Sequence, residues 1–191
     1  MLTISMTKNQ IKNKVYDCIT FYQANMLFQL RFEILKDVVD YFVICEANKS
    51  HTGLKKEFNF NPKIPEKYKH KIIYIKVTDL PDIKIKGKKD YKLLSLQMEN
   101  LFKGIKSASQ NDLIIFSDED EIPNPNIINS FNYKKYKFGI FLQNMYYYKL
   151  NIMNIDEGNG NWAGSRICQR KNLKSFFKLR LLKIKNLEYP F

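Results

Sequence analysis

The stretch that decides the fold is VYDCITFYQANMLFQLRFEILKDVVDYFVIC, residues 15–45. Residues 15–21 are β-branched and aromatic, which is typical of a strand. Residues 26–35 carry apolar side chains at spacings of three and four, which predicts a helix. The positions expected to face the core are Leu27, Leu30 and Ile34. Residues 41–45 form a continuous apolar run, typical of a strand buried on both faces. This order predicts an α/β domain with a largely parallel sheet, because parallel strands need a crossover connection.

The same alternation continues beyond residue 45. Lys71–Val77 and Leu113–Phe116 are further strand candidates, and Tyr91–Ile105 has apolar residues at helical spacing. The carboxy-terminal part, including Gly139–Leu150 and the residues from Arg166 onward, is more β-rich and mixed. A chain of 191 residues fits one domain. We therefore expect residues 1–191 to form a single α/β domain, with a mostly parallel central sheet flanked by helices and a mixed carboxy-terminal part.

Composition excludes several classes of protein. Hydrophobic residues make up 45% of the chain and aromatic residues 14%, which is enough for a proper core. No apolar stretch reaches the ~18–20 residues that a membrane helix needs, so we expect no transmembrane segment. Residues 1–14 lack the apolar region and the small-residue cleavage site of a secretion signal. We therefore expect a cytoplasmic protein.

The net charge of +13 raises the question of nucleic-acid binding. However, 28 of the 32 basic residues are Lys and only four are Arg, whose guanidinium makes the paired hydrogen bonds that read bases and clamp phosphates. A solvated Lys-rich exterior explains this charge better than a nucleic-acid interface does. We expect no specific nucleic-acid partner, whereas a small ligand that carries phosphate remains compatible with the charge.

The most informative segment for function is DLIIFSDEDEIPNP, residues 112–125. An apolar strand is followed by four consecutive carboxylates, Asp118, Glu119, Asp120 and Glu121. Ligands of open α/β sheets bind at the carboxyl ends of strands, and a hard divalent cation would offset the repulsion among the carboxylates. In extended geometry Asp118 and Asp120 project to the same side. The alternative is a solvated turn or a helix cap, which would not require a buried strand before it.

Several blocks of the chain together resemble glycosyltransferase family 17. They are residues 15–53, residues 112–125, YYYKLN at 146–151 and WAGSR at 162–166. This family includes the β-1,4-mannosyl-glycoprotein N-acetylglucosaminyltransferases. The resemblance implies a GT-A fold, in which an Asp-x-Asp motif holds Mn²⁺ or Mg²⁺ against the diphosphate of a nucleotide sugar.

Carried over position by position, the resemblance assigns roles to individual residues. The motif falls on Asp118 and Asp120, with Asp120 as the direct metal ligand and Asp118 nearer the ribose or a metal-bound water. The residues assigned to donor binding are Glu46, which would face the nucleotide, Asn48, His51, Gln97, Ser117, Asp118 and Glu119. Those assigned to the acceptor are Trp162 and Arg166, although Trp162 is equally well explained as a core residue and Arg166 as a partner of phosphate or of the acidic residues.

An inverting transfer needs a carboxylate that takes the proton from the acceptor hydroxyl. The candidates are Glu121, Asp156 and Glu157. We thus expect metal-dependent transfer of a sugar, N-acetylglucosamine by family default, from a UDP-sugar to a glycan or another hydroxyl acceptor. The family continues beyond Leu179-Arg180, so we expect this chain to lack the family's carboxy-terminal segment. A catalytically weak or silent module that binds sugar nucleotides or glycans is the alternative.

Overall fold

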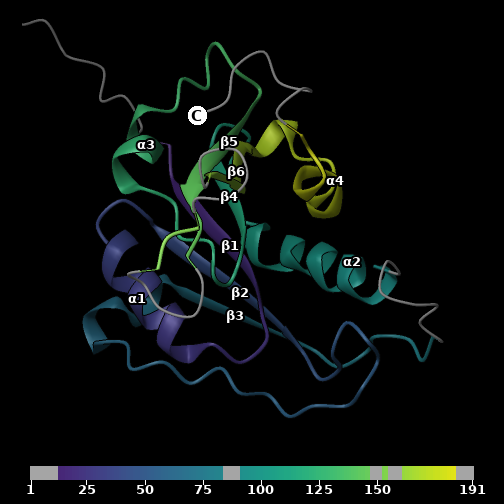
Figure 1. The fold of residues 1–191 in the computed structure, drawn as a ribbon. Coiled ribbons are helices and arrows are strands. Elements are labelled where there is room, and N and C mark those ends of the chain that lie inside the picture. Colours follow the sequence, from purple (N-terminus) through teal and green to yellow (C-terminus); the bar gives the residue numbers. More distant parts are fainter. Residues whose placement is uncertain (1–12, 84–90, 147–151, 155–160, 184–191) are drawn as a thin grey trace, which may run out of the picture.

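The computed structural model describes residues 13–83, 91–146, 152–154 and 161–183 (Figure 1). Its centre is a six-stranded sheet with the order β3-β2-β1-β4-β6-β5. Four short apolar runs form the parallel part of the sheet. They are β1 (Val15–Phe21), β2 (Tyr41–Ala47), β3 (Ile72–Val77) and β4 (Leu113–Asp118). β1 and β4 are buried almost along their whole length, which explains why their sequences do not alternate between apolar and polar residues.

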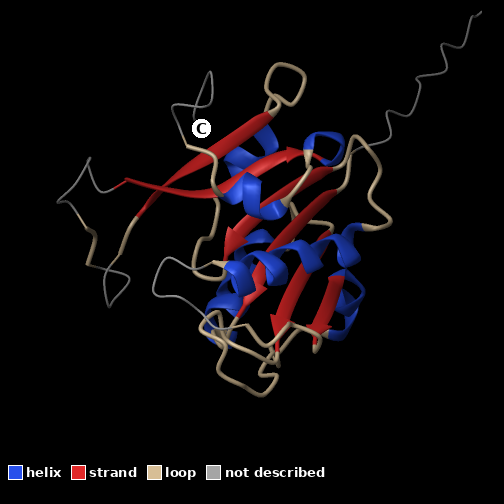
Figure 2. Ribbon diagram, turned by 90° about the vertical axis from the view of Figure 1, so that its right-hand side faces the viewer, coloured by secondary structure: helices blue, strands red, loops and turns tan. Residues whose placement is uncertain are grey.

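The carboxy-terminal part adds two strands of opposite direction. β6 (Asn161–Gln169) runs antiparallel to β4, and β5 (Phe138–Asn144) runs antiparallel to β6 at the edge of the sheet. In Figure 2 this pair extends beyond the rest of the sheet. The predicted α/β class, with a mostly parallel sheet flanked by helices and a mixed carboxy-terminal part, is confirmed.

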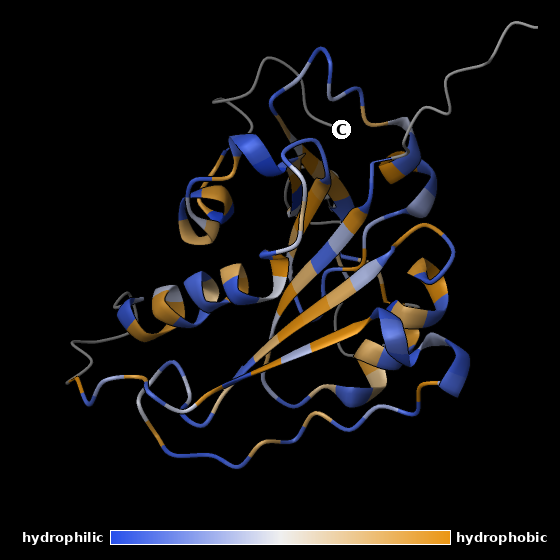
Figure 3. Cartoon of the chain, turned by 180° about the vertical axis from the view of Figure 1, so that it is seen from behind, coloured by the Kyte–Doolittle hydropathy of each residue, from blue (hydrophilic) through white to orange (hydrophobic). Residues whose placement is uncertain are grey.

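Helices cover both faces of the sheet (Figures 1 and 2). α1 (Asn25–Leu35) and α3 (Pro125–Ser130) pack on one face. α2 (Lys92–Glu99), its 3₁₀ continuation η2 (Asn100–Ile105) and α4 (Phe176–Arg180) pack on the other. The short 3₁₀ helix η1 (Glu66–Lys71) directly precedes β3, and η4 (Arg170–Asn172) directly follows β6. The central strands carry long hydrophobic stretches, whereas the connecting loops are largely hydrophilic (Figure 3). No helix among the described residues is long and apolar enough to cross a membrane.

The predicted inner face of α1 is wrong. Leu30 and Ile34 are 37% and 41% exposed, whereas the buried positions are Phe28, Phe32 and Leu35 together with Arg31. Both sets of residues recur at helical spacing, so periodicity alone does not distinguish them. The rings of Phe28 and Phe32 bury more surface than aliphatic side chains would, and both of them contact Phe42 of β2. The helix therefore turns its aromatic side toward the sheet.

Candidate active site

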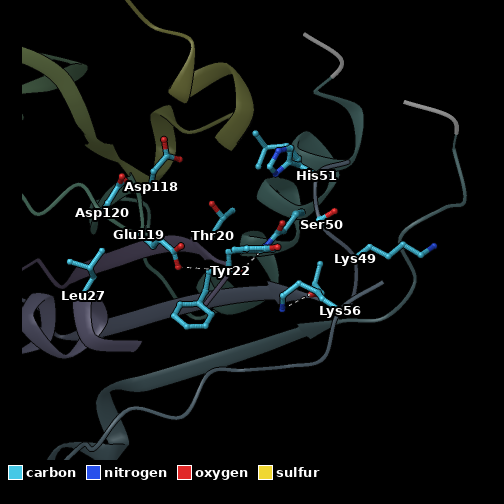
Figure 4. A pocket seen from close by; sticks show the side chains of 14 residues that line it. Thr20, Tyr22, Leu27, Lys49, Ser50, His51, Lys56, Asp118, Glu119 and Asp120 are labelled. Carbon is cyan, nitrogen blue, oxygen red and sulfur yellow. Dashed lines mark hydrogen bonds between the residues drawn. The ribbon is translucent and has the colours of Figure 1, made fainter. Parts of the chain in front are cut away.

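A pocket of about 440 Å³ lies at the carboxyl ends of the central strands (Figure 4). The chain passes from β1 to β2 and β3 on one side, and then returns to place β4 on the other side of β1. The strand order therefore reverses at β1, and such switch points are where open α/β sheets bind ligands. The pocket is lined by the end of β1 with Tyr22, by the loop after β2 with Lys49, Ser50, His51 and Lys56, by α2 with Leu94 and Gln97, and by Asp118, Glu119 and Asp120.

Residues Asp118–Glu121, here called the acidic turn, close one wall of this pocket. The backbone N–H of Glu121 donates to the carbonyl of Asp118 at 3.1 Å, and the Glu121 carboxylate accepts from the backbone N–H of Asp118 at 3.2 Å. The segment is thus a tight turn, and the extended geometry predicted for it is wrong. Asp118 and Asp120 nevertheless both line the pocket, on the side opposite Lys49, His51 and Lys56 (Figure 4).

Glu119 joins the acidic turn to the end of β1. Its Oε2 accepts from the backbone N–H of Tyr22 at 2.9 Å and from that of Ala24 at 3.4 Å. These contacts hold the loop between β1 and α1 against the loop after β4. The predicted donor-binding residue therefore lines the pocket, but one of its oxygens is already used to shape it.

Glu121, the last residue of the acidic turn, does not line the pocket and is 6% exposed. Its Oε1 accepts from the indole Nε1 of Trp162 at 2.7 Å and from Nη2 of Arg180 at 3.2 Å. Burial, with the neighbouring charge of Asp118, raises the pKa of the Glu121 carboxyl. Trp162 is 42% exposed, so it is not a core residue, and its ring lies beneath the Arg180 guanidinium at 5.9 Å.

Arg180 is a site residue that the sequence analysis missed. It reaches from α4 to the acidic turn, where Nε and Nη2 donate to Oδ2 of Asp118 at 3.1 and 2.7 Å. The acidic turn therefore has a built-in positive charge. The sequence offered one signal for Arg180, the rarity of arginine, which occurs only four times in this Lys-rich chain.

A second arginine holds the acidic turn from inside the protein. Arg31 of α1 is completely buried and makes two bonds of 2.6 Å to the carboxylate of Asp17 in β1. Its Nη1 donates to the backbone carbonyl of Glu121, also at 2.6 Å. The sequence analysis missed this pair as well, although an aspartate inside an otherwise apolar strand and an arginine inside an apolar helix were visible signals.

Arg166 does not lie where an acceptor contact would require. It is 4% exposed, and its Nη1 donates to the carbonyls of Ala163 and Gly164. Its Nη2 donates to the carbonyl of Leu182 at 3.2 Å, just beyond α4. Burial lowers the pKa of Arg166 to about 10. Arg166 thus anchors the end of α4, the helix that carries Arg180, and the predicted acceptor contact is not what the structure shows.

Glu46 is also turned away from the pocket, contrary to the prediction. It is completely buried, and its carboxylate accepts from Nζ of Lys56, from the Tyr74 hydroxyl and from the backbone N–H groups of Asn59 and Phe60. A buried carboxylate needs such partners because burial without them is costly. Glu46 thereby fixes the long loop after β2, which brings Lys56 to the pocket wall.

The remaining predicted residues divide into four groups. His51 and Gln97 line the pocket, and Nε2 of Gln97 donates to the carbonyl of Cys45 at 2.9 Å. Ser117 is buried and donates to Oγ of Ser165 at 2.7 Å, so it does not reach the pocket. Asn48 follows β2, and its buried Oδ1 has no hydrogen-bond partner in the described part of the chain. Asp156 and Glu157 lie outside the described residues.

The carboxylates of the acidic turn fit a divalent cation whose coordination shell is completed by phosphate oxygens. The described residues contain no group of three or more His, Cys, Asp or Glu side chains that could hold a metal ion. Within the described part of the chain, Oδ1 of Asp118 accepts no hydrogen bond, and neither does the exposed Asp120 carboxylate. Mg²⁺ and Mn²⁺ commonly bind one or two carboxylates and take other ligands from water and substrate phosphates. The carboxylates of Asp118 and Asp120, both lining the pocket, match that requirement.

A family model places this architecture among known proteins. The model described as glycosyltransferase family 17 matches residues 4–178. The chain belongs to glycosyltransferase family 17. The recognition of this family from the sequence is thereby confirmed. Both sides of the pocket lie within the matched residues.

Curated relatives of this family 17 chain include the β-1,4-mannosyl-glycoprotein 4-β-N-acetylglucosaminyltransferases of Rattus norvegicus and Homo sapiens, each 26% identical over 128 residues. The enzyme of the same name from Mus musculus is 25% identical over 128 residues. Each match covers 62% of this chain and only 23% of the relative. Among solved structures, a 4-diphosphocytidyl-2C-methyl-D-erythritol synthase aligns with 84% of this chain and 77% of its own, at 11% identity and a TM-score of 0.42.

Proposed function

We propose that this family 17 protein transfers a sugar from a nucleotide-diphosphate donor to a hydroxyl group of a glycan or a similar acceptor. The observation that carries the proposal is the pocket at the switch point, where the carboxylates of Asp118 and Asp120 face basic side chains across a space of about 440 Å³. The names of the curated relatives support N-acetylglucosamine as the sugar and a mannosyl glycan as the acceptor class. Membership of family 17 supports sugar transfer as the reaction class.

The donor would lie across the pocket. Lys56, held by Glu46, and the exposed His51 supply positive or polar groups on the side of the loop after β2. Tyr22 is 44% exposed and has its backbone N–H fixed by Glu119, so it offers a positioned ring to a base or a sugar. The diphosphate would then face the acidic turn, where like charges need a cation between them.

We propose that Asp118 and Asp120 hold Mn²⁺ or Mg²⁺ together with that diphosphate. The cation, when bound, stabilises the negative charge that grows on the leaving diphosphate. The chain's own contribution is to keep the two carboxylates in place, through Arg180 on Asp118 and through the tight turn that exposes Asp120.

We further propose that the transfer inverts the anomeric centre, with a carboxylate as the proton acceptor. Both oxygens of Glu121 accept hydrogen bonds, and Glu121 is not among the residues that line the pocket. This arrangement favours Asp156 or Glu157 as the base and gives Glu121 the task of orienting Trp162. Trp162, half-exposed beside the turn, is then a platform for the acceptor sugar, since aromatic rings offer an apolar face with a polar handle.

A silent module that binds sugar nucleotides without transferring sugar is the second candidate. It is favoured by the Arg180 contact, which occupies one oxygen of Asp118, and by the lack of a third metal-ligating side chain within the described residues. Such a module would bind a UDP-sugar with Mn²⁺ but release no UDP.

The decisive experiment compares Asp120→Asn with Asp37→Asn, an exposed carboxylate between α1 and β2, just before the amino end of β2. We expect Mn²⁺-dependent release of UDP from UDP-N-acetylglucosamine, measured with and without a mannosyl glycan. Asp120→Asn should lose at least about 100-fold in rate, because it removes a charge-assisted metal contact, with little change in thermal midpoint. Equal rates in the two variants would contradict the metal assignment, and binding without UDP release in the unmodified protein would favour the silent module.

A further inference from the structure

The acidic turn already contains a cation. Arg180 donates to Oδ2 of Asp118 through two nitrogens and to Oε1 of Glu121 through one, while its guanidinium lies 5.9 Å from the centre of the Trp162 ring. Its side chain is 19% exposed. Hydrogen bonds between ionised groups are stronger than those between neutral groups. Asp118, one of the two proposed metal ligands, is therefore bound to a fixed positive charge before any metal arrives.

The position of Arg180 is fixed by the packing of α4. Ser175 caps the start of the helix: its Oγ accepts from the backbone N–H of Lys178 and donates to Glu99 of α2 at 2.6 Å. Phe176 is fully buried against Phe102 and Phe116. Arg166 holds the carbonyl of Leu182 beyond the helix. These contacts fix the helix that carries Arg180 beside the acidic turn.

A fixed guanidinium has opposite effects on two ligands. A divalent cation bound at Asp118 and Asp120 would lie close to Arg180, and like charges repel strongly in a partly buried site. Arg180 also takes half of the Asp118 carboxylate, which reduces the charge left for the metal. A diphosphate, in contrast, brings negative charge that both the guanidinium and the metal can neutralise.

We propose that Arg180 makes metal binding conditional on the nucleotide diphosphate. The residue suppresses the binding of a lone divalent cation at the acidic turn, and the diphosphate relieves this suppression when it enters the pocket. Metal and nucleotide thus bind as a unit, and by linkage each strengthens the binding of the other by the same factor. This inference rests on the proposed function, because it takes Asp118 and Asp120 as the metal-binding residues.

The test measures Mn²⁺ binding by the loss of the electron paramagnetic resonance signal of free Mn²⁺, with and without saturating UDP. It compares the unmodified protein with Arg180→Gln. We expect Mn²⁺ alone to bind Arg180→Gln about tenfold tighter, and the enhancement by UDP to shrink by the same factor of about ten. Lys178→Gln is the matched control, since it removes an exposed positive charge from the same helix and should change neither value.

A second measurement on the unmodified protein covers the case in which Arg180→Gln does not fold. Mn²⁺ alone should scarcely raise the thermal midpoint, whereas Mn²⁺ with UDP should raise it clearly, because a ligand that binds only the folded state stabilises it. An equal shift with and without UDP overturns the inference. So does unchanged or weaker binding of Mn²⁺ alone to folded Arg180→Gln. Failure of the unmodified protein to bind Mn²⁺ even with UDP overturns both the inference and the proposed metal site, which distinguishes the two failures.

Discussion

Replacing Arg31 with Met should cause one of the largest losses of stability available to a single substitution in this protein. Arg31 is 0% exposed and its partner Asp17 is 1% exposed, with two bonds of 2.6 Å between them. Arg31→Met leaves the Asp17 carboxylate buried without a cation. Removing one member of a buried ion pair costs about 3–5 kcal/mol. The carbonyl of Glu121 also loses a hydrogen bond from a charged donor, worth about 1.5–3 kcal/mol, although Ser165 remains within 3.4 Å of it.

The double variant Asp17→Val/Arg31→Met separates stability from function. Two apolar side chains of suitable shape can replace a buried ion pair with little loss, so the double variant should recover most of the free energy of unfolding. It does not restore the hydrogen bond to Glu121, so the acidic turn should stay less ordered and UDP with Mn²⁺ should bind more weakly. The assay is urea denaturation followed by circular dichroism, with nucleotide binding measured in parallel. A loss of less than about 1 kcal/mol for Arg31→Met would refute the reasoning, since that is the range of an exposed pair.

Two further predictions concern packing and pH. In Gly104→Ala, the new Cβ would lie 2.3 Å from Cγ1 of Val43, so η2 must move away from the sheet; we expect a loss of about 1–3 kcal/mol in urea denaturation, and an unchanged midpoint would contradict this close contact. The pKa of Glu121 is raised in the folded state, so its contribution to stability is fully present below its unfolded pKa and is lost as pH rises through the folded pKa. In the unmodified protein the free energy of unfolding should therefore gain a declining contribution from about pH 4.5 upward, and Glu121→Gln should lack it. Identical pH profiles of the two proteins would contradict the shift.

The strand and helix order, and the place of the acidic turn at a strand end, could be predicted from the sequence. The strand–helix–strand order of residues 15–45 could be predicted because strand and helix patterns repeat within a few residues. The acidic turn was recognisable for a similar reason, since four carboxylates stand directly after an apolar strand and before two prolines. Family 17 membership followed from the combination of such blocks and is confirmed by the family model.

By itself, then, the sequence determined the α/β class, the family and the location of the charged turn, all of which depend on neighbours along the chain. Only the tertiary structure decided which face of α1 is buried, that Glu46 turns inward, and that Arg180 meets Asp118 across 62 positions of sequence. A charged side chain has no local pattern that reveals its partner. Its place depends on which opposite charge the packing of helices and sheet brings within hydrogen-bond distance, since burial without one costs several kcal/mol.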